Sequence, residues 1–156
     1  MIRVYRLYRR RRREPAFTGE GARLEGARWN LPGTPAVYAA STLGLALLEF
    51  LVHVDPSEMD LERLDLETRS ADIPSDLTIL EVPNRSLPDQ WNAIPWSRSS
   101  QTFGTRLLHE AKYLAIAVPS VVVPSERNYL LNPLHPDFSK IKLASPKLFV
   151  IDQRLF

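Results

Sequence analysis

The amino-acid sequence predicts an α+β domain, in which the short strands of a twisted, mixed sheet are joined to a few helices. Apolar and basic residues alternate over residues 2–8, which is the period of a strand with one covered face. Residues 43–53 form an apolar run of helical length, and residues 121–123 are β-branched valines between two prolines. Because nothing in the 156 residues marks a second folding unit, we expect one domain over residues 1–156.

The remaining elements follow from local signals. Ser41 or Thr42 can cap the helix over residues 43–53, and Pro56 lies just beyond its expected end. This helix is apolar nearly all round, which predicts that most of its surface is buried. The acidic, proline-punctuated residues 55–90 are expected to form a surface excursion. We also expect a helix over residues 102–114, a buried strand over 121–123, and strands over 35–40, 77–82 and 147–152.

The composition excludes several kinds of site and location. Without cysteine, the chain can form neither a disulfide scaffold nor a thiolate metal site. His53, His109 and His135 lie far apart in the sequence, so we expect no metal. No apolar run approaches the roughly 20 residues of a membrane-spanning helix, and the N-terminus lacks the apolar segment of a secretory signal. We therefore expect a soluble, cytoplasmic protein with no membrane partner.

Charge is distributed unevenly behind the net charge of +2. Residues 1–30 contain nine arginines and three glutamates, whereas residues 55–90 contain ten acidic residues and three arginines. The consecutive arginines from Arg9 to Arg13 could form a solvated loop, contact nucleic acid, or contact an acidic partner or a phosphate-bearing substrate. Few aromatic residues lie nearby and no recognition helix is evident, so direct nucleic-acid binding is not favoured.

Glu49 is the single carboxylate on the predicted apolar helix. An isolated buried charge is strongly destabilising, so a carboxylate beside Leu45, Leu48 and Val52 requires a partner or a water-lined cleft. Glu49 is therefore either a functional carboxylate in a cleft or a structural partner of an arginine.

Three further residues could contact a ligand. Arg28 lies in a glycine-bearing loop, where its guanidinium can bind phosphate, although a surface ion pair is equally compatible. Tyr38 belongs to the core or stacks on a flat heterocycle with its hydroxyl in water. Ser120 could donate to a sugar or amide, or could simply begin a strand. It lacks the G-x-S-x-G surroundings of a hydrolase nucleophile, and the chain lacks the glycine motifs of ATP-binding and Rossmann folds.

In combination, these residues resemble the RES-domain family, which is named for shared Arg, Glu and Ser positions. The resemblance covers nearly the whole chain in the family's order. Ala27 and Ala40 depart from the family's usual glycine and polar residue, and both are small. The matching stretches are Val4-Tyr5-Arg6, Gly21-Ala22, Gly26-Ala27-Arg28-Trp29-Asn30, Tyr38 with Ser41, residues 46–49, Val118-Pro119-Ser120, Asn128, Leu131-Asn132-Pro133, His135-Pro136-Asp137-Phe138, Asp152 and Arg154-Leu155-Phe156.

The resemblance implies a toxin with a fold similar to the ADP-ribosyltransferases, paired with an Xre-like helix-turn-helix antitoxin. Members of the family degrade NAD by hydrolysis or phosphorolysis, and some transfer ADP-ribose to a protein. By position, Glu49, Arg28, Tyr38 and Ser120 would form the catalytic or NAD-binding set, with Arg6 as a weaker NAD-binding candidate. NAD would be the substrate, with no cofactor or metal required.

These implied roles follow the charge changes of the reaction. Glu49 would stabilise the positive charge on the ribose, and Arg28 would hold the diphosphate. Tyr38 would border the nicotinamide, and Ser120 would hydrogen-bond near the nicotinamide ribose.

Two alternatives compete with NAD loss to solvent. One is a protein ADP-ribosyltransferase with the same site, and the other is a non-enzymatic nucleic-acid-binding module that uses Arg9 to Arg13. We also expect the antitoxin to occlude the site, and we leave open whether toxin subunits form a homodimer within a larger complex.

Overall fold

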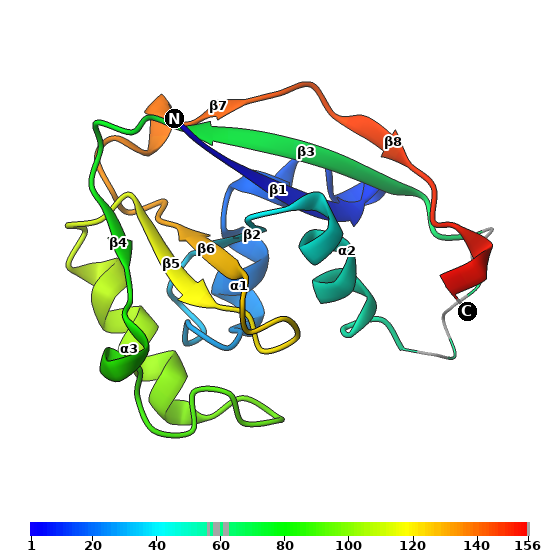
Figure 1. Ribbon diagram of the computed structural model, residues 1–156. Coiled ribbons are helices and arrows are strands. Elements are labelled where there is room, and N and C mark those ends of the chain that lie inside the picture. The colour runs from blue at the N-terminus through cyan, green and yellow to red at the C-terminus, as the bar shows by residue number, and fades with distance from the viewer. Residues whose placement is uncertain (56, 58–59, 61–62, 156) are drawn as a thin grey trace.

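One eight-stranded mixed sheet carries the fold in the computed structural model, which describes residues 1–55, 57, 60 and 63–155 (Figure 1). Three α-helices within this part of the chain lie beside the sheet, and the α+β expectation is confirmed. The helices are α1 (Glu20–Glu25), α2 (Leu43–Leu51) and α3 (Arg98–His109). The strands are β1 (Ile2–Arg9), β2 (Val37–Ala40), β3 (Leu66–Ile73), β4 (Ile79–Glu81), β5 (Ala115–Pro119), β6 (Arg127–Leu131), β7 (Lys142–Leu143) and β8 (Lys147–Phe149).

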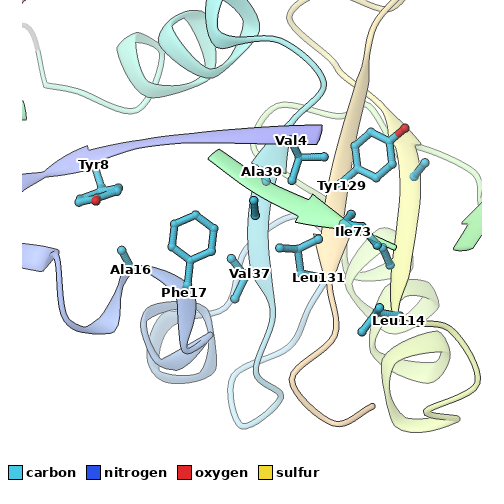
Figure 2. Packing of buried hydrophobic residues seen from close by; sticks show 13 residues of the cluster. Val4, Tyr8, Ala16, Phe17, Val37, Ala39, Ile73, Leu114, Tyr129 and Leu131 are labelled. Atoms are coloured by element: carbon cyan, nitrogen blue, oxygen red, sulfur yellow. The ribbon is translucent and has the colours of Figure 1, made fainter. Parts of the chain in front are cut away.

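The sheet divides between β1 and β2. Its strand order is β4-β5-β6-β2-β1-β3-β7, with β8 also paired to β3, and every pair except β4–β5 is antiparallel. β1 pairs with β3 along its whole length, but its register with β2 is limited to Tyr5 opposite Ala40. Figure 2 shows β1, with Val4, running across the strands that carry Val37 and Leu131. The two parts of the sheet therefore diverge beyond that contact.

The largest cluster of buried side chains packs on one face of this curved sheet (Figure 2). Val4 from β1, Val37 from β2 and Leu131 from β6 are fully buried, and Phe17 covers them from the loop before α1. Burial of a large apolar side chain contributes roughly 1.5–3 kcal/mol relative to exposure. This packing fixes the central strands from one face of the sheet and leaves side chains on the other face available for other contacts.

The apolar helix α2 is less buried than its sequence predicts. Thr42 caps it by accepting a hydrogen bond from the N–H of Leu45, and the helix ends at Leu51 rather than at residue 53. Leu45 and Ala46 are buried, but Leu48 is 41% exposed. The prediction that most of the helix surface is buried is therefore wrong, because only one face of α2 contacts the sheet.

Helix α3 begins at Arg98 rather than at residue 102, and it also ends earlier than expected. Ser97 caps it by accepting a hydrogen bond from the N–H of Ser100. It ends at His109 rather than at residue 114, because Ala111 adopts a left-handed φ of 49° and the chain then enters the buried strand β5. No helix in the described part of the chain is both long and apolar enough to cross a bilayer.

Two expectations about strands are corrected. The segment 55–90 contains β3, which pairs with all eight residues of β1, so it is not only a surface excursion. The sequence analysis did not predict β3, because its residues are mostly polar and the strand is stabilised by pairing with segments distant in the sequence. Conversely, residues 121–123 form bends and are partly exposed, while the buried strand is β5, just before them. The expected strand over 77–82 is confirmed as β4.

The arginine run, which begins at the last residue of β1, is partly folded onto β3. Arg13 donates from both Nε and Nη2 to the carboxylate of Glu67, and Arg10 lies 3.6 Å from the same carboxylate. Glu67 is 4% exposed, and the Arg13 hydrogen bonds hold the pKa of this carboxyl below its usual range. At least two of these arginines therefore have a structural role, which weakens the nucleic-acid interpretation.

Replacing Arg13 should make stability depend on pH in a defined way. In Arg13→Ala, Glu67 loses the hydrogen bonds that lower its pKa, so the free energy of unfolding at pH 7 should fall below the wild-type value. The deficit should shrink below the ordinary glutamate value of 4.5, because protonation of Glu67 removes the same attraction from the wild type. Urea titrations across this range measure the effect. Arg11→Ala, at an exposed position of the same run, should show no such convergence.

Candidate active site

A cavity of about 720 Å³ lies where β1 and β2 diverge. Its lining includes Arg6 from β1, Tyr38 from β2, Glu49 from α2 and Arg28 from the loop between α1 and β2. Ser120, the fifth residue predicted for the site, is fully buried and does not line the cavity. The structure therefore brings four of the five predicted side chains to one cavity.

The carboxylate of Glu49 is held by two side chains from other elements. Its Oε1 accepts a hydrogen bond of 2.7 Å from Ser120 Oγ and another of 2.6 Å from Asn128 Nδ2. Among the described residues, the ion pairs within 4.0 Å do not include Glu49. Glu49 is half-buried and lines the cavity, where its negative charge acts on Arg28 without a direct ion pair.

The hydroxyl of Ser120 has a fixed orientation. Its oxygen accepts hydrogen bonds of 3.0 Å from the N–H groups of Val122 and Val123, and its hydrogen is donated to Glu49. A serine hydroxyl has one proton and two acceptor positions, so all of them are used. The expected contact with the nicotinamide ribose does not fit this geometry, because the buried Ser120 contacts Glu49 instead.

Asn128 is a site residue that the sequence analysis did not identify. It lies in β6, lines the cavity and donates to Glu49 from a position 79 residues away in the sequence. A single polar residue near the start of a strand carries no local signal of function. Its inclusion in one of the stretches that resemble the RES-domain family was the available indication.

Arg28 joins its own loop to a distant segment. Its Nη1 donates to the carbonyl oxygens of Trp91 and Ala93, each at 2.8 Å. Burial lowers the pKa of Arg28, and the charge of Glu49 acts in the opposite direction. Among the described residues, Arg28 forms no ion pair within 4.0 Å, so the alternative of a surface ion pair is not observed. The guanidinium borders the cavity while it secures the 91–93 segment.

Tyr38 holds the loop that carries Arg28. Its hydroxyl accepts a hydrogen bond of 3.0 Å from the N–H of Trp29 and donates one of 2.7 Å to Asn30 Oδ1. Burial raises the pKa of this hydroxyl. The ring of Tyr38 lines the cavity, as its predicted role requires, but the expectation that its hydroxyl remains in water is wrong.

Helix α3 supports the same loop from the other side. Ser100 Oγ donates to the carbonyl of Arg28 at 2.7 Å, and Thr105 Oγ1 accepts the N–H of Leu31 at 2.8 Å. A Cβ atom at Gly104 would lie 2.0 Å from the carbonyl oxygen of Trp29, so only glycine allows this close approach. The backbone around Arg28 is therefore fixed by contacts on two sides.

Arg6 places a second guanidinium at the cavity. Its Nη1 donates to the carbonyl of Tyr38 at 2.8 Å, and its buried Nε has no hydrogen-bond partner among the described residues. Burial lowers the pKa of Arg6 to about 10, and nearby Tyr8 and Tyr38 act in the opposite direction. Arg6 therefore stays charged at neutral pH, and no carboxylate in the described part of the chain pairs with it within 4.0 Å.

The sequence matches the RES domain over residues 3–152. This chain belongs to the RES domain family. "Toxin Res" of Photorhabdus laumondii is 40% identical, over 97% of this chain and 96% of that protein. "Toxin Res" of Yersinia enterocolitica is 35% identical, over 97% and 98%. The "Prs ADP-ribosylating toxin" of Sphingobium sp. is 37% identical, over 89% and 86%. The chain is accordingly a RES-domain toxin.

A solved structure shares the fold of this RES domain. The toxin–antitoxin complex MbcT–MbcA of M. tuberculosis contains a chain that superimposes with a TM-score of 0.68. The two chains are 21% identical, and the match covers 95% of this chain and 84% of the other. This similarity confirms the expected curved, mixed sheet with few helices.

An apolar rim surrounds the cavity of this RES domain. We define it by four cavity-lining side chains, Val52 after α2, Ile94 and Trp96 from the segment before α3, and Val122 after β5. They are 59%, 85%, 38% and 36% exposed, respectively. Large apolar side chains that are exposed together around one cavity are typical of a binding surface.

The lining of the cavity indicates what kind of ligand it fits. One carboxylate and two guanidiniums line a volume in the range of small-molecule sites, and aromatic side chains complete the lining. The part of the chain that the structure describes contains no group of three or more His, Cys, Asp or Glu that could hold a metal ion. The site of this RES domain therefore suits a ligand that combines anionic groups with a cationic centre.

Removing the hydroxyl of Tyr38 should loosen the loop that carries Arg28. In Tyr38→Phe, the N–H of Trp29 and the Oδ1 of Asn30 lose their partner, which should lower the free energy of unfolding by about 1–3 kcal/mol. Urea denaturation measures the change. Tyr129→Phe is the matched control, because the Tyr129 hydroxyl forms no hydrogen bond with the described residues. Equal stability losses in the two variants would contradict the proposed anchoring.

Proposed function

We propose that this RES-domain toxin depletes NAD by cleaving the bond between nicotinamide and ribose. The observation that carries the proposal is a carboxylate, Glu49, held by two neutral donors at a cavity that also contains Arg6 and Arg28. NAD offers a diphosphate for the arginines and a positively charged nicotinamide-ribose for the carboxylate. Hydrolysis would transfer the ribosyl carbon to water, and phosphorolysis would transfer it to inorganic phosphate.

The charge changes of this reaction fit a fixed anion. The nicotinamide ring of NAD is a cationic pyridinium and becomes neutral when it departs. Its departure therefore requires little acid assistance. Positive charge develops instead on the ribose as the glycosidic bond breaks. Glu49 stabilises that charge, and its effect is strengthened because its donors are already oriented before the reaction.

The guanidiniums of Arg28 and Arg6 already form different hydrogen bonds, which leaves each with different donors for a ligand. Arg28 already donates from Nη1 to two carbonyl groups, and it would hold the diphosphate with its remaining donors. The buried Nε of Arg6 has no partner in the described part of the chain, so an anionic ligand would offset its charge. The ring of Tyr38 would border the nicotinamide. Ser120 acts through Glu49 rather than on the sugar.

Replacing the Glu49 carboxylate should abolish most NAD turnover. Glu49→Gln keeps the side-chain shape but removes the charge, so turnover should fall on the order of 10²-fold or more. NMR and mass analysis of NAD after incubation, with and without phosphate, measures the rate and identifies the product. Glu81→Gln, at an exposed position in β4, should retain wild-type turnover. A correctly folded Glu49→Gln with undiminished turnover would refute the catalytic role.

Transfer of ADP-ribose to a protein is the second candidate function. It is favoured by the 37% identity with the "Prs ADP-ribosylating toxin" of Sphingobium sp.. The same carboxylate would stabilise the ribosyl cation, and a protein side chain would replace water as the acceptor. Labelled NAD separates the two functions, because free ADP-ribose or its phosphate indicates NAD loss, whereas label fixed on a protein indicates transfer.

We also propose that an Xre-like helix-turn-helix antitoxin covers the cavity. The fold is shared with a chain of a toxin–antitoxin complex, and the apolar rim offers a surface for a protein partner. Purified antitoxin should therefore suppress NAD turnover when mixed with the toxin in equal amounts. Full turnover in the stable complex would contradict occlusion. Light scattering of the same complex measures whether two toxin subunits are present.

A further inference from the structure

We propose that Asn128 is a positioning residue, which fixes one oxygen of Glu49 and leaves the other for the ribose. The proposal rests on the function proposed above, because it assigns Asn128 a role through the reacting carboxylate. Nothing in its local sequence distinguishes Asn128 from an ordinary strand residue. Its role follows from where its amide group lies in the folded chain.

Both side-chain donors to Glu49 converge on the same oxygen. Ser120 Oγ lies 2.7 Å and Asn128 Nδ2 lies 2.6 Å from Oε1, and no described residue provides a hydrogen bond to Oε2. Two donors on one oxygen restrict rotation of the carboxylate about its terminal bond. Oε2 is therefore the oxygen that remains available to a ligand in the cavity.

The backbone of Asn128 is more firmly held than that of its two partners. β6 lies between β2 and β5, and Asn128 is in register with Ala40 on one side and Val118 on the other. Glu49, by contrast, lies in the last turns of a helix that is partly exposed, and Ser120 follows the end of β5. The amide of Asn128 therefore provides a fixed reference position for the carboxylate.

The chemical type of Asn128 is as important as its position. An amide donates a hydrogen bond to a carboxylate without bringing a positive charge. A lysine or arginine at the same place would form an ion pair with Glu49 and weaken its attraction for a ribosyl cation. The neutral donors Asn128 and Ser120 hold the carboxylate without forming such an ion pair.

Kinetics of Asn128 variants test this role. Asn128→Ala should lower kcat for NAD by about 10-fold or more, because a charge-assisted hydrogen bond is lost, while KM changes less than about threefold. Asn128→Asp keeps the size but replaces a donor with a second negative charge, so its kcat should fall further. A rise in KM with unchanged kcat would overturn the proposal, because Asn128 would then bind substrate directly. Unchanged kcat and KM would also overturn it.

A double-mutant cycle distinguishes positioning from a general structural effect. If Asn128 acts through the Glu49 charge, Asn128→Ala should cause little further loss of turnover in the Glu49→Gln background. Losses that multiply independently would overturn the proposal. Circular dichroism and thermal melting of each variant confirm that comparisons are made between folded proteins.

NMR tests the contact without depending on turnover. The side-chain amide resonances of Asn128 should differ between the folded wild type and Glu49→Gln, because the variant lacks the charged acceptor. The amide of Asn132, which donates to the carbonyls of Leu108 and Tyr113, is the internal control and should not shift. An unchanged Asn128 amide would overturn the contact. If this difference is observed but the wild type does not consume NAD, the contact stands and the proposed function is refuted.

Discussion

The hydrogen bonds from Ser120 and Asn128 to one oxygen of Glu49 are the interaction on which the site depends. A half-buried carboxylate without partners is costly, and charge-assisted hydrogen bonds typically contribute about 1.5–3 kcal/mol each. These bonds also connect α2 to β6 and to the residue that follows β5, across 79 and 71 residues of sequence. The same contacts therefore stabilise the charge and fix the helix that carries it beside the place where the sheet divides.

The part of the cavity lined by Arg28 depends on a different set of contacts. The loop carrying Arg28 is fixed by the hydroxyl of Tyr38, by Ser100 and by the close approach of Gly104. Arg28 in turn holds the 91–93 segment by donating hydrogen bonds to two of its carbonyl groups. Arg28 and Glu49 are thus positioned by different sets of side-chain contacts, which are joined through the pairing of β2 with β6.

The sequence was most informative where one residue contradicted its surroundings. A lone carboxylate on an apolar helix predicted that Glu49 needs a cleft, and the structure places it at a cavity. Local patterns failed where long-range pairing determines structure. β3 has a polar sequence but is stabilised by β1, and residues 121–123 have strand-forming side chains but lie outside the sheet. The role of Asn128 requires the register of β6 against β2, which no local pattern contains.

The entrance of the cavity is built differently from its interior. Residues 94–96 and 121–123 lie outside regular helices and strands, whereas Arg6, Tyr38 and Glu49 belong to such elements. Side-chain substitutions at the entrance should therefore leave the groups behind it in place, as long as the N–H groups of Val122 and Val123 still hold Ser120. Related proteins with this architecture can therefore differ in which molecules enter the cavity while they keep the same reacting groups.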